Sequence, residues 1–126
     1  MSDKKYPYVN HMNILCEALQ LIDIPTLVGK CTDQWYNQTL CKVNESVVRL
    51  GIIKGEYHWH KHDNEDEFFF TLSGELLLDI EGKEAVTLKQ HQGYVVPKRI
   101  VHRTCATEKT VILMIETAGI IPTGDE

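Results

Sequence analysis

The chain has 126 residues, a length typical of one domain that can bury a core without support from a metal or disulfides. Its net charge of −5 gives no basic surface for nucleic acid, and it has no apolar run of about 18 residues that could span a membrane. The N-terminus lacks the apolar core of a signal peptide and the four cysteines are scattered, so we expect a cytoplasmic protein with reduced thiols.

Residues 1–34 are predicted to form an N-terminal helical segment. Between residues 10 and 22 the apolar side chains recur at helical spacing, and Pro25 follows just past the expected end. We therefore expect one amphipathic helix packed on the outside of the remaining chain. Such a helix can simply cover its own chain, or it can help to build a dimer contact, and the pattern fits both.

Residues 35–126 contain many short segments of β character separated by turn signals. Such even spacing predicts an all-β antiparallel sandwich or barrel, which here ends in an extended C-terminal tail. One of the turns is expected at residues 108–109. The predicted strands, apart from the histidine segment described next, are 36–43, 46–53, 67–72, 75–80, 85–89, 93–96, 102–106 and 111–116.

Three histidines alternate with other residues at positions 58, 60 and 62. In a strand, side chains two residues apart point to the same face, so the three imidazoles would lie on one side. The polar residues 63–66 read as a turn, and Glu67 opens the next strand. A hairpin of this shape would bring Glu67 beside His60 and His62. Two imidazoles and a carboxylate are good ligands for a divalent transition metal.

Two motifs in this region resemble the two signatures of the cupin family. The first is His60-x-His62-x4-Glu67-x6-Gly74, and the second is Pro97 followed five residues later by His102, with Arg99 where glycine is often found. With the strands between them they cover residues 45–118. The resemblance implies a double-stranded β-helix, or jelly-roll, barrel in which one metal ion is held by His60, His62, Glu67 and His102.

This set of ligands suits iron, manganese, nickel or zinc and leaves coordination positions open for water, dioxygen or a substrate. Strand parity with Glu67 and His102 places three further residues beside the ion, namely Phe69, Thr71 and Thr104. His58 either lies at the mouth of the barrel, where it supports a metal ligand or contacts a substrate, or is simply solvated. Candidates for holding an anionic substrate are Tyr57, Arg49, Lys98 and Arg99, although strand parity does not place Arg49.

Two functions of different classes remain open. The first is a small metalloenzyme, such as a dioxygenase or other oxygenase, an isomerase or a lyase, acting on a small polar molecule that coordinates the metal. The alternative is a non-catalytic cupin module that binds a small molecule, with the metal holding the ligand or stabilising the barrel. The expected partners are a small-molecule ligand and a second copy of the chain, because small cupins commonly form homodimers and a partner covers exposed sheet edges. Neither nucleic acid nor a membrane is expected as a partner.

Overall fold

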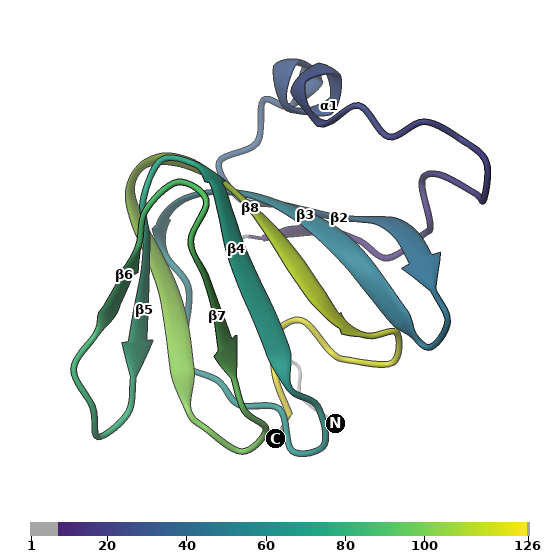
Figure 1. The fold of residues 1–126 in the computed structure, drawn as a ribbon. Coiled ribbons are helices and arrows are strands. Elements are labelled where there is room, and N and C mark those ends of the chain that lie inside the picture. The colour runs from purple at the N-terminus through teal and green to yellow at the C-terminus, as the bar shows by residue number, and fades with distance from the viewer. Residues whose placement is uncertain (1–7, 126) are drawn as a thin grey trace.

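The computed structural model describes residues 8–125, which form eight strands and one short helix (Figure 1). The expected all-β jelly-roll architecture with one helix is confirmed. Predicted bounds agree with the observed ones most closely for β2 and β7. The elements are β1 Val9–His11, α1 Ile24–Lys30, β2 Tyr36–Val43, β3 Ser46–Glu56, β4 Glu67–Ser73, β5 Leu76–Ile80, β6 Val86–Leu88, β7 Gly93–Val96 and β8 His102–Thr117.

Strand β8 belongs to both layers of the fold. Its first residues pair with β5, which also pairs with β6. Its second half lies between β3 and β4 in the larger sheet, whose order is β1-β2-β3-β8-β4-β7. Figure 1 shows β8 rising on one side, bending over the top and descending on the other. Both of its ends therefore lie at the same open end of the barrel.

The turn predicted at residues 108–109 is wrong, because β8 runs through this stretch as one bent strand. The side chains at 107–109 are exposed, which is why the sequence there resembles a turn. The pairing of β3 with β8 shifts register between Ile53 and Gly55, so both strands bend together at this level and neither reverses direction.

Two hydrophobic clusters lie on opposite faces of the large sheet. The inner cluster fills the barrel and includes Phe69, Leu78 and Ile112. The outer cluster is centred on Leu50 and Ile52 of β3. Side chains from the segment around α1 cover it, namely Ile22, Ile24, Leu27 and Val28.

The helix predicted over residues 10–22 is wrong in position. The helix in this part of the chain is α1, where Asp23 accepts a hydrogen bond from the Thr26 N–H and Pro25 lies in the first turn. Pro25 therefore begins a helix instead of following one, as its fixed φ and missing N–H allow. Among residues 8–125, no helix is long and apolar enough to cross a membrane.

Residues 12–22 form no helix, and part of their backbone bonds to strand β2. The N–H groups of Leu15 and Cys16 donate to the carbonyls of Thr39 and Leu40 at 3.1 and 2.8 Å. A helix gains most of its stability when its apolar face packs against other residues. The apolar side chains that recur at helical spacing in this segment do not pack together against one surface. Several of them are exposed to solvent, including Leu19.

We predict that these exposed apolar side chains take part in a homodimer. Leu19 and Leu21 are 106% and 88% exposed in the single chain, and burying such side chains favours association. In sedimentation velocity, wild type should run at twice 14.5 kDa, and the double variant Leu19→Ser/Leu21→Ser should run at 14.5 kDa. The control variant Val95→Ser, which removes an exposed apolar side chain elsewhere on the surface, should stay dimeric. A wild type that sediments only as a monomer at micromolar concentration contradicts the prediction.

Candidate metal centre

The histidine segment reaches the barrel interior by pairing with β8, not by forming a hairpin with β4. Residues 57–66 form no continuous strand, and one isolated bridge joins His60 to His102 through N–H···O bonds of 2.9 and 2.8 Å. Glu67, at the start of β4, pairs with Val96 and Glu116. The predicted histidine strand and hairpin are therefore wrong, although Glu67 still lies beside the histidines.

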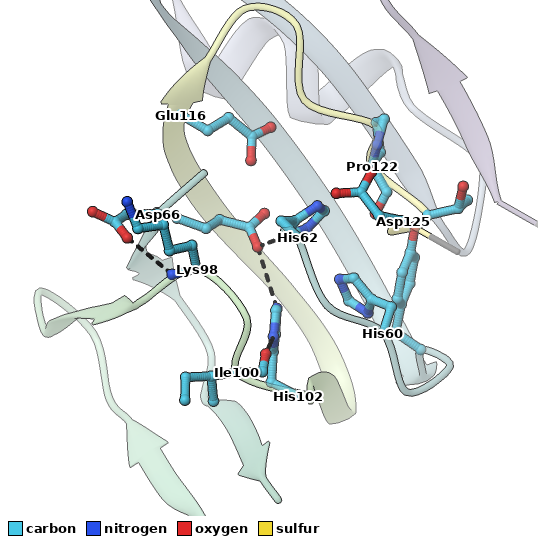
Figure 2. Close-up of polar contacts among 12 residues, drawn as sticks. His60, His62, Asp66, Lys98, Ile100, His102, Glu116, Pro122 and Asp125 are labelled. Carbon is cyan, nitrogen blue, oxygen red and sulfur yellow. Dashed lines mark hydrogen bonds and ion pairs between the residues drawn. The ribbon is translucent and has the colours of Figure 1, made fainter. Parts of the chain in front are cut away.

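Four candidate ligands converge at the open end of the barrel. One ligand atom from each of them lies within 4.8 Å of all the others. Glu67 Oε1 is 3.4 Å from His62 Nε2 and 3.3 Å from His102 Nε2 (Figure 2). His62, Glu67 and His102 are buried, and His60 is partly exposed.

The donor arrangement fits a bound cation. The Nδ1 atoms of His60 and His102 lie 3.0 and 2.9 Å from backbone carbonyls, to which an N–H at this position donates. In the neutral imidazoles, Nε2 then carries the lone pair, and at His102 this lone pair faces the Glu67 oxygen. The His102 lone pair and the Glu67 oxygen repel each other, and a cation bound between them would attract both. Two ligand atoms that each lie about 2.1 Å from one ion, with an angle of roughly 90° to 109° at the ion, are about 3.0–3.4 Å apart. The Glu67 oxygen and the Nε2 atoms of His62 and His102 have this spacing.

Electrostatics keep the cluster ready for metal binding near neutral pH. Burial, with help from nearby His102, lowers the pKa of His60 from 6.5 to about 3, so its imidazole stays neutral. Burial alone would raise the pKa of Glu67, but the adjacent rings of His102 and His62 hold it below its ordinary value. Burial and the adjacent Glu67 carboxylate raise the pKa of Glu116 well above its ordinary value.

Arg49, which strand parity did not place, lies on the inner face of the large sheet beside the cluster. Its Nε is 3.2 Å from Glu116 Oε1, and both side chains are 1% exposed. Its Nη1 also contacts the sulfur of Met12 at 3.6 Å. Arg49 is therefore fixed by neighbours within the chain.

The loop after β7 holds His62 by its backbone. The N–H of Arg99 donates to the carbonyl of His62 at 2.7 Å. Arg99 has φ +71°, a left-handed conformation that glycine adopts without strain. Lys98 and Arg99 are themselves exposed at the surface.

The predicted pocket residues divide into two pairs. Phe69 and Thr104 line a cavity that also contacts His60 and Glu67. Thr71 does not line it, because its buried hydroxyl donates to the carbonyl of Leu88 at 3.2 Å. His58 lies to one side of the cluster, where its ring stacks on Tyr57 and Tyr8.

Sequence reasoning missed the far wall of this cavity, which β1, β2 and the residues beside them supply. Tyr8, Trp35 and Asn37 are among the lining residues there. No local motif marks these positions. Only the register, in which Asn37 pairs with Gly51 and Gly51 with Ile112, places them on the inner face.

Comparison with known proteins identifies the family. The profile of the family described as "Cupin domain" matches residues 49–116. The chain belongs to the cupin family. It is similar to the uncharacterized protein YdbB of Bacillus subtilis, with 44% identity over 90 residues that cover 71% of this chain and 80% of that protein.

Solved structures of other proteins share the fold. A cupin-2 domain protein from Shewanella frigidimarina superposes with a TM-score of 0.73 at 27% identity, covering 77% of this chain and 94% of that one. Hydroquinone 1,2-dioxygenase from Sphingomonas, solved with 4-hydroxybenzoate bound, superposes with a TM-score of 0.72 at 17% identity. That match covers 81% of this chain and 33% of the dioxygenase. At this identity the likeness concerns the fold alone.

The lowered pKa of His60 predicts an acid sensitivity that can be measured. Unfolded, this histidine takes up a proton near pH 6.5, whereas in the folded chain it does so only near pH 3. Its contribution to stability is therefore lost as pH falls from about 6.5 towards 3. Between pH 7 and 4.5, metal-free wild type should lose about 2 kcal/mol more than His60→Asn in urea unfolding. His91→Asn, at an exposed turn, should behave as wild type, and equal losses in all three proteins contradict the prediction.

Proposed function

We propose that this protein is a small metalloenzyme in which His60, His62, Glu67 and His102 hold a divalent transition metal. A small molecule would enter the barrel and bind that metal directly. The observation that carries the proposal is that His60 and Glu67 also line the cavity, so a ligand inside it reaches the ion. A closed structural zinc site is usually rich in thiolates, whereas this set has none and leaves room for further ligands.

The cavity favours a ligand with a flat, largely apolar body. Its volume is about 50 Å³ and it opens to solvent, so it suits only a small molecule. Aromatic rings from Trp35, Tyr57 and Phe69 form part of its wall, and Ile112 and Met114 form part of its apolar lining. Aromatic side chains pack well against planar groups.

Two buried polar atoms in the wall call for a hydrogen-bonding group on the ligand. Asn37 Oδ1 and Glu116 Oε2 have no hydrogen-bond partner among the residues that the structure describes, and both residues line the cavity. A buried polar atom without a partner costs about 1–3 kcal/mol, which a ligand can recover. Asn37 Oδ1 can only accept, so it selects a ligand that carries an O–H or N–H.

The proposed chemistry divides between the ion and the chain. A bound transition metal supplies Lewis acidity and, when it is iron or manganese, exchanges electrons with dioxygen. Glu67 supplies the negative charge that favours a cation. The apolar wall excludes water from the ligand, and Asn37 orients it. If a ligand binds and no substrate is turned over, the protein is instead a non-catalytic binding module.

Loss of His102 tests the metal assignment. We expect His102→Ala to lower cobalt(II) affinity by more than the roughly 10- to 100-fold that follows loss of an outer-shell partner. Elemental analysis and chelator competition measure this, and circular dichroism should show that the barrel still folds. His91→Ala is the matched control. Equal metal content in His102→Ala and wild type would remove the basis of the proposal.

Phenol and anisole test the role of Asn37. Both have a flat ring, but only phenol has an O–H to donate to Asn37 Oδ1. We expect phenol to bind about 5- to 30-fold more tightly than anisole, equivalent to 1–2 kcal/mol, and Asn37→Leu to remove this difference. Chemical-shift titration of the zinc-loaded protein gives both dissociation constants. Equal affinities for the two probes in wild type contradict the assignment of Asn37.

A further inference from the structure

The C-terminal tail lies along the histidine segment. The Tyr57 hydroxyl donates to the carbonyl of Pro122 at 3.2 Å. A ring nitrogen of His58 is 2.6 Å from the carbonyl of Thr123. The side chains that precede the candidate ligands are therefore held by main-chain atoms of the tail.

Asp125 binds the same segment closer to the metal cluster. Its N–H donates to the carbonyl of Lys61 at 2.8 Å, and its carboxylate accepts the N–H of Asp63 at 2.7 Å. These two bonds lie on either side of His62, so Asp125 is fixed next to this ligand (Figure 2).

Gly124 allows this close approach. Its φ is +96°, and a Cβ atom added there would lie 2.6 Å from the Cβ of His60 and 3.1 Å from the carbonyl oxygen of Lys61. Any other residue at position 124 would strain the tail or displace His60.

His62 differs from the other two candidate histidine ligands in its second ring nitrogen. His60 and His102 have Nδ1 within 3.0 Å of a backbone carbonyl. His62 is 2% exposed, and neither of its ring nitrogens makes a hydrogen bond within the described range, residues 8–125. Metal-binding histidines almost always donate their other N–H to a carbonyl or carboxylate. An acceptor for His62 is therefore expected.

Two carboxylates besides Glu67 lie near His62, each beyond hydrogen-bond distance in this structure. A ligand atom of His62 lies within 4.8 Å of carboxylate oxygens of Glu65 and Asp125, and His62 Nε2 faces Glu67. Asp125 is held in place by its two backbone bonds, whereas no hydrogen bond or ion pair is found for Glu65 among residues 8–125.

We propose that Asp125 is a positioning residue of the metal centre, which accepts the Nδ1–H of His62 when Nε2 binds the ion. The tail from Thr123 to Asp125 thus belongs to the site and fixes the orientation of His62. This inference rests on the proposed metal role of the histidine cluster.

The test compares two substitutions that remove the same charge. Asp125→Asn should weaken cobalt(II) binding about 10- to 100-fold in chelator competition, the range typical of a lost outer-shell partner. Asp66→Asn is the matched control, because Asp66 also accepts a backbone N–H, from Lys98 at 2.9 Å, but lies outside the cluster. Its affinity should stay within threefold of wild type. Glu65→Gln should behave as the control does.

Two further measurements separate positioning from folding. The metal-free thermal midpoint of Asp125→Asn should stay within a few degrees of wild type. In the zinc-loaded protein, nitrogen-15 NMR should show an exchange-protected Nδ1 proton on His62 that is lost in Asp125→Asn. Gly124→Ala should also weaken metal binding, by displacing the tail.

The outcomes distinguish this inference from the proposed function. A wild type that binds no cobalt(II) overturns both. If wild type binds and His102→Ala does not, but Asp125→Asn binds within threefold of wild type, only the role of Asp125 is wrong. A larger loss in Glu65→Gln than in Asp125→Asn, or two ions bound per chain, also overturns that role.

Discussion

The buried carboxylate of Glu67 is the group to which the rest of the interior is adapted. An ionised carboxylate away from water costs several kcal/mol unless partners compensate it. Here the ring nitrogens of His62 and His102 face it at 3.4 and 3.3 Å, and a cation held between these atoms would compensate its charge. Because the histidine segment makes few ladder hydrogen bonds, its path is set by these contacts and by the loops and tail that hold it.

The bend in β8 brings the two sides of this arrangement together. His102 is the first residue of the strand and Glu116 is one before its last, yet both lie near Glu67 because the strand crosses from one layer to the other. A site built on one long strand and on the start of β4 has a rigid scaffold, which restricts the movement of the candidate ligand side chains. The less regular histidine segment then needs its own support from neighbouring loops.

The inner face of the large sheet carries more polarity than folding requires. Three buried polar atoms on β2 and β8 make no hydrogen bond with any group of residues 8–125: Asn37 Oδ1, Thr39 Oγ1 and Glu116 Oε2. Native proteins leave few such atoms without partners, and those that remain are often found where a ligand binds. Apolar side chains at these positions would make the folded chain more stable. The buried polar atoms are therefore better explained by a role in ligand binding than by a role in stability.

The sequence by itself determined the local features and the set of candidate metal ligands. Alternating patterns and turn residues located β2 and β7 within their observed bounds, and the spacing of His60, His62, Glu67 and His102 identified residues that converge in space. These signals are local, or lie in motifs whose spacing fixes the geometry.

Tertiary structure alone decided the features that depend on pairing between distant segments. Residues 12–22 have helical spacing but bond to β2, and residues 108–109 resemble a turn but continue a strand that bends with β3. Asn37 reaches the cavity through sheet register, and Asp125 reaches His62 through bonds to a segment about sixty residues earlier. No short-range pattern encodes such contacts, because their free energy comes from surfaces that meet only when the barrel closes.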